Sequence, residues 1–213
     1  MLDADRLLPY TLAVVALILA PGPNQAMVVA RSLNGGRRAG IMTSLGVNTG
    51  TAFHTIAAAL GLSALLATSA LAFSIVKLLG AAYLLYLGIR LLAGRDHAMS
   101  LPPVDAAPAR AAGGVNAYGR AIVTGILNSK VALFFLAFLP QFVDRQAGSI
   151  FLQFLLLGTI IAAVGLAFDS ALATAAGSLG RLLARNPRAA RWRERITGTA
   201  FVALGIRLAF ERR

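Results

Sequence analysis

Long apolar segments separated by short polar linkers dominate this chain, and they restrict what it can fold into. Six such segments are recognisable, at residues 7–33, 41–67, 71–93, 118–143, 149–177 and 193–210. A helix that crosses the hydrocarbon core of a bilayer needs about 20 apolar residues. Charged residues make up only 13% of the sequence, against about 25% in soluble domains. The sequence therefore predicts an integral membrane protein built from helices.

The first apolar segment is interrupted by Pro21-Gly22-Pro23, which follows the run from Leu7 to Ala20. Two prolines around a glycine cannot sit in a continuous helix, because each proline lacks a backbone donor and clashes with the preceding turn. The run before the break rises about 21 Å, so the break falls inside a bilayer of about 30 Å. Broken helices at this depth are where transporters bind their cargo. A loop after a short first helix is the alternative.

Arginines are concentrated in alternate linkers. The linkers after the first, third and fifth segments hold most of them, whereas the linker after the second segment has none and the one after the fourth has only Arg145. By the positive-inside rule, loops 1–2, 3–4 and 5–6 are cytoplasmic and both termini face outside. The net charge of +12 then reflects orientation in the membrane, not nucleic-acid binding. A version with five spans, in which Ile196 to Phe210 does not cross, is the alternative.

One longer linker, residues 96–116, separates two sets of three predicted helices, residues 1–95 and 117–213. Since three is odd, the second set runs in the opposite sense to the first, as in an inverted repeat. The fourth segment has its own interruption, Leu127-Asn128-Ser129-Lys130, which matches the break in the first. We therefore predict an all-α integral membrane protein with six transmembrane helices, arranged as two inverted three-helix repeats with broken helices 1 and 4.

Four polar residues within the apolar segments fall at one predicted depth. At about 1.5 Å per residue from the cytoplasmic end of each segment, Asn24 lies roughly 10 Å deep, Asp169 roughly 12 Å and Lys130 roughly 15 Å, with Asn48 at a similar level. Ionisable groups inside a membrane are costly, so they usually face a cavity and have a partner. A shared cargo cavity is the favoured interpretation. A purely structural Lys130–Asp169 ion pair is the alternative.

His54 lies deeper in the second segment. Two interpretations are open for it: a structural hydrogen bond to a neighbouring helix, or a role in proton coupling. Gly46 and Gly50 form a small-xxx-small face that is typical of helix packing. Serines within the segments lack the nucleophile-elbow context of hydrolases. A chain without cysteine and with two histidines is poorly supplied with ligands for a transition metal. The sequence therefore predicts no enzyme, no metal site and no cofactor.

A series of motifs runs through the first four segments in chain order: Pro21-Gly22-Pro23-Asn24, Gly35-Gly36-Arg37-Arg38-Ala39-Gly40, Leu45-Gly46-Val47-Asn48-Thr49-Gly50, Lys77 to Gly88, Leu127-Asn128-Ser129-Lys130 and Phe138 to Val143. Together they resemble the LysE/RhtB family of bacterial amino-acid exporters. That family usually has Asn-Pro-Lys where this chain has Asn128-Ser129-Lys130, so the second break lacks its proline. The resemblance implies six helices in the cytoplasmic membrane, export of amino acids or close derivatives, and drive by the proton-motive force.

We predict a secondary active exporter of neutral amino acids, homoserine or threonine, or homoserine lactones, which works by alternating access. The predicted partners are the amino-acid cargo, protons and the lipid bilayer, with homo-oligomerisation left open and no nucleic acid. A passive channel or a helical membrane scaffold is the alternative. The predicted substrate-binding residues are Pro21, Gly22, Pro23, Asn24, Asn48, Asn128 and Lys130, and the proton-coupling candidates are Asp169 and His54.

Helix ends suggest how such a site binds its cargo. The backbone amides after Pro23 and after Lys130 lie at the positive ends of half-helices and are expected to face a carboxylate, with Lys130 adding charge. The carbonyls freed before Pro21, together with Asp169, are expected to take an ammonium. Asp169 is also the candidate proton carrier, because burial in a membrane favours the neutral form of a carboxyl group.

Overall fold

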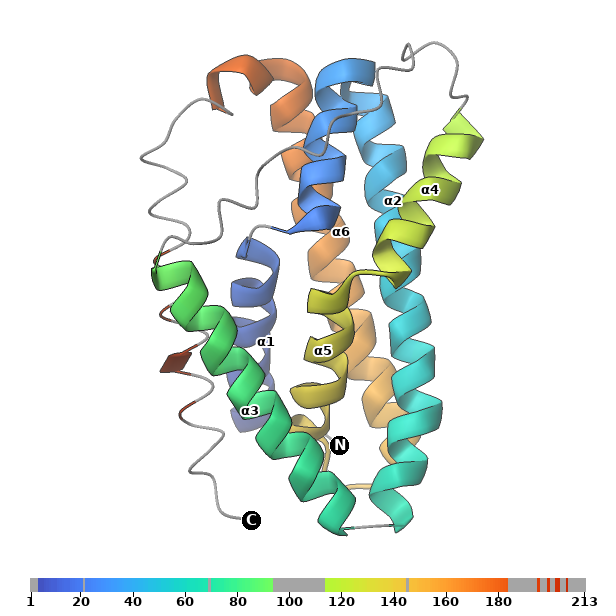
Figure 1. Cartoon of the computed structure of the whole chain (residues 1–213). Helices are drawn as coiled ribbons and strands as arrows, with labels where there is room; N and C mark the ends of the chain where they lie inside the picture. Colours follow the sequence, from blue (N-terminus) through green and yellow to red (C-terminus); the bar gives the residue numbers. More distant parts are fainter. Residues whose placement is uncertain are drawn as a thin grey trace.

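The computed structural model describes residues 4–20, 22–68, 70–93, 114–144 and 146–183, together with a few single residues beyond them. Every regular element in this part of the chain is a helix, which confirms the all-helical prediction there (Figure 1). Most of the predicted sixth helix, residues 193–210, lies outside the described residues. The elements are α1 (Ala4–Leu19), α2 (Pro23–Thr68), α3 (Ala70–Leu92), α4 (Gly114–Ile126), α5 (Ser129–Ala137), the 3-10 helix η1 (Leu139–Phe142) and α6 (Ile150–Leu183).

Helix α2 consists of two helical pieces that meet at Gly36. Gly36 has a φ of 75° and a ψ of 179°, a conformation that glycine adopts without steric cost because it has no Cβ. In Figure 1 the piece before Gly36 and the piece after it run in opposite directions beside each other. A Cβ on Gly40 would overlap Ser32, which places the two pieces in direct contact. The predicted linker between segments 7–33 and 41–67 is therefore reduced to one tight turn.

Both predicted helix breaks are present. The chain bends by 54° between Leu7–Leu19 and Pro23–Ala64, and by 43° between Ala117–Ile126 and Ser129–Phe142. By length and composition, Ile150–Ala176 within α6 can cross a membrane by itself, and each bent pair can supply one broken span, which in the first pair ends at the Gly36 turn of α2. The described part of the chain is thus that of a helical membrane protein with two interrupted spans.

The second break forms without a proline because Asn128 caps α5. Asn128 has an extended backbone (φ −72°, ψ 97°), and its side-chain Oδ1 accepts a hydrogen bond from the Lys130 backbone N–H at 3.1 Å. Asparagine is among the best N-cap residues, since its side chain satisfies an amide that has no partner within the helix. The backbone N–H of Asn128 donates to the Gly125 carbonyl at 3.3 Å, which closes the end of α4. A side-chain cap thus replaces the missing proline.

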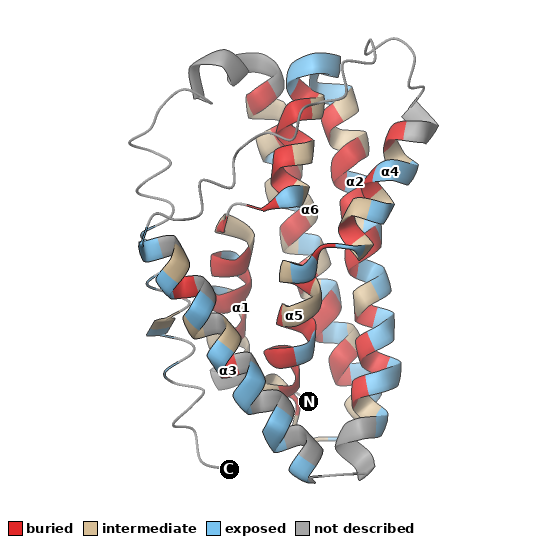
Figure 2. Cartoon of the chain, in the orientation of Figure 1, coloured by how far each residue is buried: buried red, intermediate tan, exposed pale blue. Residues whose placement is uncertain are grey.

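Exposed residues alternate with buried ones along the helices (Figure 2), and many of the exposed residues are large and apolar. More than half of the surface of Leu12, Phe53, Leu60, Leu71 and Leu127 is exposed. Contiguous exposed apolar surface of this kind marks contact with a membrane or with another protein. This surface belongs in lipid, as the apolar composition predicts.

An aromatic cluster of Tyr10, Phe134, Phe138 and Phe142 fills the bundle toward the end where the N-terminus lies. Successive ring centroids are 5.1 Å apart for Tyr10 and Phe142, 4.8 Å for Phe138 and Phe142, and 4.7 Å for Phe134 and Phe138. The buried Tyr10 hydroxyl donates to the Leu157 carbonyl at 2.5 Å. This cluster joins α1, α5, η1 and α6 into one packed unit at that end.

Glycines bring α2 and α4 into backbone contact. A Cβ on Gly50 would lie 2.7 Å from the Gly125 Cα, and one on Gly46 would lie 2.7 Å from the Tyr118 carbonyl oxygen. Real Cβ atoms do not approach backbone so closely, so neither position accepts a larger residue without moving a helix. The predicted packing role of Gly46 and Gly50 is confirmed.

Gly50→Leu is therefore expected to force α2 and α4 apart and to destabilise the protein by about 1–3 kcal/mol or more, because a backbone neighbour cannot yield by changing rotamer. Gly61→Leu is the matched control on the same helix, since a Cβ there meets nothing within 4 Å. Thermal unfolding of both variants in detergent measures the difference. Equal stability of the two variants would contradict the packing role.

Candidate functional site

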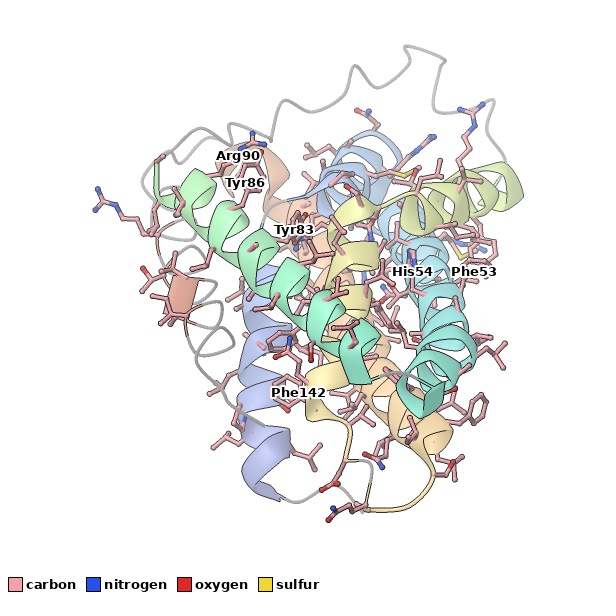
Figure 3. All side chains as sticks on the ribbon, turned by 60° about the horizontal axis from the view of Figure 1, so that its bottom comes forward. Phe53, His54, Tyr83, Tyr86, Arg90 and Phe142 are labelled. Atoms are coloured by element: carbon pink, nitrogen blue, oxygen red, sulfur yellow. The ribbon has the colours of Figure 1, made fainter. Side chains whose placement is uncertain are left out.

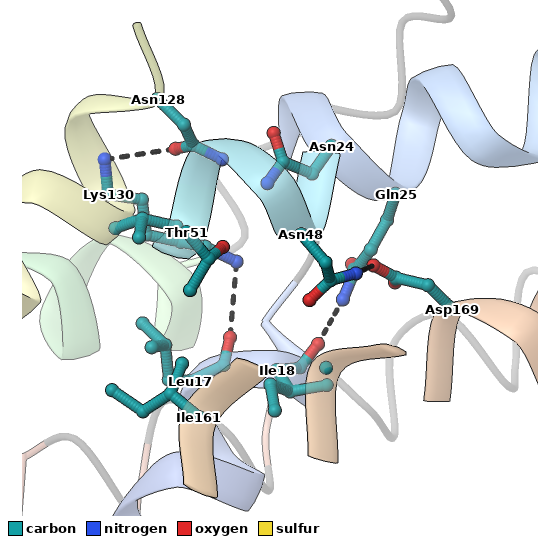
Figure 4. Close-up of a pocket in the computed structure, with 12 residues that line it drawn as sticks. Leu17, Ile18, Asn24, Gln25, Asn48, Thr51, Asn128, Lys130, Ile161 and Asp169 are labelled. Carbon is teal, nitrogen blue, oxygen red and sulfur yellow. Dashed lines mark hydrogen bonds between the residues drawn. The ribbon is translucent and has the colours of Figure 1, made fainter. Parts of the chain in front are cut away.

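The two helix breaks lie beside one cavity of about 50 Å³, which is formed by the end of α1, both pieces of α2, the start of α5 and the middle of α6 (Figure 4). A buried water needs roughly 10–15 Å³ of such volume, so the cavity has room for only a few water-sized groups. An amino acid is larger than this, and its entry requires the surrounding helices to move. Five of the predicted site residues line the cavity: Asn24, Asn48, Asn128, Lys130 and Asp169.

Lys130 extends from the first turn of α5 to the C-terminal end of α1. Its Nζ donates hydrogen bonds to the carbonyl oxygen of Ala20 at 2.7 Å and to that of Leu17 at 3.1 Å. The last four carbonyls of a helix have no partner within the helix, and a cation there also complements the negative end of the helix dipole. Lys130 therefore ties the second broken helix to the end of the first.

Gly22 lets this lysine side chain pass close to the backbone of the first break. A Cβ on Gly22 would lie 3.0 Å from Lys130 Nζ and 3.2 Å from its Cε. Gln25 satisfies a further carbonyl at the end of α1, because its Nε2 donates to Ile18. The sequence predicts that the carbonyls before Pro21 bind an ammonium. In the structure they accept hydrogen bonds from side-chain donors.

Asp169 lies in α6, on the opposite side of the cavity from Lys130 (Figure 4). Only 6% of its surface is exposed, and its Oδ2 accepts a hydrogen bond from Asn48 Nδ2 at 3.3 Å. The same Nδ2 donates to the Ser44 carbonyl at 2.9 Å, which fixes the orientation of the amide. The site therefore combines a held ammonium with a buried carboxylate.

Two buried amide atoms of the cavity have no hydrogen-bond partner among the described residues. They are Oδ1 of Asn24, an acceptor, and Nδ2 of Asn128, a donor. Asn128 is 2% exposed, and buried polar groups of native proteins almost always have a partner. The pair offers one donor and one acceptor to a small molecule that carries both a positive and a negative group.

Of the remaining predicted residues, those that the structure describes do not line the cavity. Pro21 is outside the described residues, and Pro23 is exposed at the start of α2. His54 lies on the second piece of α2 beside Phe53 (Figure 3), and the centroid of its ring is 6.3 Å from that of Phe53 and 5.9 Å from that of Phe135. Its buried Nε2 has no hydrogen-bond partner within the described part of the chain. The structure therefore does not bring His54 to the cavity.

The model of the LysE type translocator family matches residues 15–212, a range that contains every residue that lines the cavity. The chain belongs to the LysE type translocator family. Membership of this family and the apolar exterior together establish a transmembrane protein of a transport family.

Curated relatives of this LysE type translocator align over almost their full length. An uncharacterized membrane protein of Pseudomonas aeruginosa is 35% identical over 200 residues, which cover 94% of this chain and 93% of the relative. An uncharacterized membrane protein of Vibrio cholerae is 30% identical over 208 residues, 98% of each chain. The leucine efflux protein of Salmonella typhimurium is 29% identical over 206 residues, 94% of this chain and 92% of the relative. No solved structure matches the chain with significant similarity.

Sequence reasoning missed several residues at the cavity of this LysE type translocator. Thr51 and Gly165 are each one helical turn from a predicted residue, Asn48 and Asp169 respectively, so helical periodicity could have found them. Gly165 has to be small, because a Cβ there would lie 2.8 Å from Asn48 Oδ1. The other missed residues are Gln25 and the four apolar residues Leu17, Ile18, Val131 and Ile161.

Proposed function

We propose that this translocator exports amino acids or close derivatives across the bacterial cytoplasmic membrane, with protons moving inward. The observation that carries the proposal is the cavity between the two helix breaks, which holds an ammonium, a carboxylate and two buried amide atoms that have no partner among the residues the structure describes. Such a site suits a small zwitterion. Similarity to a leucine efflux protein over almost the whole chain supports the same conclusion.

Each end of an amino-acid zwitterion has candidate partners in the cavity. The Asn128 Nδ2 donor and the positive N-terminal ends of α2 and α5 suit the carboxylate. The Asn24 Oδ1 acceptor suits the ammonium. The sequence left neutral amino acids, homoserine or threonine, and homoserine lactones open.

The apolar part of the cavity favours one of these cargo classes. Leu17, Ile18, Val131 and Ile161 supply an aliphatic wall, with Thr51 as the nearby hydroxyl. A hydroxyl on the cargo gains little from such a wall, whereas a methyl or isobutyl group gains about 0.8 kcal/mol for each buried methylene. The proposed cargo is therefore a neutral amino acid with an aliphatic side chain.

Asp169 is the proposed proton carrier. It is buried, it lines the cavity, and its Oδ2 accepts a hydrogen bond from the neutral Asn48 amide, a partner that can remain when the carboxyl group changes its protonation state. Intramembrane carboxylates in such positions act as proton relays in pumps and transporters. His54, which lies away from the cavity beside Phe53 and Phe135, is kept as a separate and weaker candidate.

The proposed architecture is that of two inverted three-helix repeats, residues 1–95 and 117–213, joined by residues 96–116. Its support is that both halves contain a helix broken near mid-length and that the two breaks meet at the cavity. The described part of the second half begins slightly earlier than this division, since α4 starts at Gly114. Loops 1–2, 3–4 and 5–6 are proposed to be cytoplasmic because the arginines collect there.

Single cysteines test this orientation in a chain that has no cysteine of its own. Ser149→Cys and Arg213→Cys are expected to react with an impermeant thiol reagent added outside intact cells, because both positions face outward in the proposed topology. Asn34→Cys, at an exposed position beside the Gly36 turn, and Ala111→Cys are expected to stay unlabelled until the cells are broken open. Labelling of Asn34→Cys from outside would overturn the orientation, and protection of Arg213→Cys alone would indicate five spans.

Efflux from preloaded membrane vesicles tests the function itself. Vesicles that contain the purified protein and a panel of labelled amino acids are expected to release neutral aliphatic amino acids faster when a proton gradient is imposed. A passive channel would equilibrate its cargo without concentrating it against a gradient, and a scaffold would release nothing above protein-free vesicles. Failure of every amino acid in the panel would remove the proposed function.

A further inference from the structure

We propose that the C-terminal end of α1 is the subsite for the cargo ammonium, and that Lys130 occupies this subsite whenever cargo is absent. Cargo and Lys130 would then exchange at the same two carbonyls. This inference rests on the proposed amino-acid transport and adds to it a mechanism of binding and release.

The chemical match between the two ligands is the first argument. Lys130 Nζ donates to the carbonyls of Leu17 and Ala20, 3.1 Å and 2.7 Å away. The ammonium of an amino acid is the same group, a compact cation with three N–H donors. A pair of carbonyls at the negative end of a helix binds either one by the same interaction.

Access to the subsite is the second argument. Leu17 and Lys130 both line the cavity, so an ammonium within it has the Leu17 carbonyl end of α1 within reach. The cavity is too small for cargo and for the extended lysine side chain together. The backbone at Gly22 lies close to the Lys130 side chain and leaves little room beside it. A second cation would also be repelled by the first. Cargo binding therefore requires Lys130 to leave.

Asp169 provides the destination for the displaced lysine. It is the carboxylate that lines the cavity, on the side opposite Lys130. When Asp169 is ionised, a displaced Lys130 gains a partner of opposite charge, so cargo can hold the α1 carbonyls. When Asp169 takes up a proton, that partner is lost, Lys130 returns to α1, and the cargo ammonium is expelled.

This exchange gives export the correct direction. A proton that reaches Asp169 from the outside would release cargo to the outside, and loss of the proton to the cytoplasm would prepare the site for new cargo. No covalent step is involved, and one proton enters as one zwitterion leaves. Lys130 thereby links the proton site to the cargo site through its two alternative partners.

Chemical rescue of a lysine-deficient variant tests the subsite. Lys130→Ala is expected to unfold at a lower temperature than the wild type, because the α1 carbonyls lose their donor. Propylammonium has the three carbons and the ammonium that the substitution removes, so it is expected to restore part of the lost thermal stability. Tetramethylammonium, a cation without N–H donors, is expected not to do so. Wild type and Lys77→Ala, the variant at the chain's other lysine, are expected not to respond.

Equal responses of Lys130→Ala to the two cations, or no response to either, would overturn the subsite. If Lys130→Ala does not fold, Lys130→Met takes its place, because methionine retains an unbranched apolar chain. A ¹⁵N measurement of the Lys130 ammonium, in a protein that keeps this lysine, gives a second readout. The chain has two lysines, so Lys77→Arg leaves Lys130 as the single lysine ammonium. L-Leucine is expected to shift its signal, and N-acetyl-L-leucine, which has no ammonium, is expected to leave it unchanged.

The two proposals fail in different ways. Propylammonium rescue does not depend on which cargo is exported, so its absence removes the subsite whatever the efflux panel shows. Export of leucine without any shift of the Lys130 signal leaves amino-acid export in place and removes the exchange. Rescue by propylammonium together with a leucine-dependent shift supports the exchange.

Discussion

Asp169→Asn is expected to abolish export driven by a proton gradient, and addition of Lys130→Met is expected not to restore it. Asparagine keeps the size of the side chain and can still pair with Asn48, but it cannot carry a proton through the cycle. In the proposed exchange, asparagine resembles protonated Asp169 and holds Lys130 at α1, so exchange of cargo without a gradient is expected to be slowed in the single mutant and to recover in part at high cargo concentration. Vesicle efflux and thermal stability, measured side by side, separate the two effects.

The competing explanation is a structural ion pair between Lys130 and Asp169. Removal of one member of a buried pair strands the other charge and costs about 3–5 kcal/mol, and removal of both recovers much of that loss. Driven export in the double mutant at the wild-type level would therefore leave only the structural pair. Asp144→Asn is the control, because it makes the same substitution at a carboxylate whose Oδ1 accepts from the Gln146 amide outside the cavity. Its export is expected to match the wild type.

Replacement of Pro21, Gly22 and Pro23 by alanine is expected to slow export by about tenfold or more, while the protein still inserts into the membrane. Three alanines favour a continuous helix, in which the carbonyls of Leu17 and Ala20 pair with backbone amides instead of with Lys130. Hydrogen bonds to a charged group contribute about 1.5–3 kcal/mol each, and about 1.4 kcal/mol corresponds to a factor of ten in rate. The measurement is gradient-driven efflux, normalised to the amount of protein in the vesicles.

Pro9→Ala is the control for this triple substitution, because Pro9 lies inside α1 and away from the break. Its export is expected to stay close to the wild-type rate. A triple-alanine protein that exports normally would show that the break is only a loop and that half-helix ends have no part in binding.

The sequence was enough to place the cavity residues along the membrane normal. Proline and glycine locate the first break, and the polar interruption of an apolar run locates the second. A rise of about 1.5 Å per residue puts Asn24, Asn48, Lys130 and Asp169 at one level. All four line one cavity in the structure. Depth is a property of one helix at a time, and it therefore follows from sequence.

The face of the helix on which each residue lies could not be predicted in the same way. At about 100° per residue, His54 is rotated by about 240° from Asn48, which carries it away from the cavity although it is only six residues further along. Lys130 reaches carbonyls more than one hundred residues earlier in the chain, a contact that depends on how α5 packs against α1. The side chains that donate to the carbonyls at the first break, those of Lys130 and Gln25, could therefore be identified only from the three-dimensional structure.

The close contact between Gly50 and Gly125 limits how the protein can change shape. Helix α2 comes from the first half of the sequence, yet its most extensive contacts are with α6 and α4 from the second half. Because α2 and α4 touch through backbone atoms, no layer of side chains lies between them to absorb sliding. Two halves that rock as rigid blocks on either side of the 96–116 linker would have to tear this contact open. If the chain is built from the two proposed repeats, the boundary between moving and stationary helices thus crosses both of them, and each contributes helices to the fixed frame and to the mobile part.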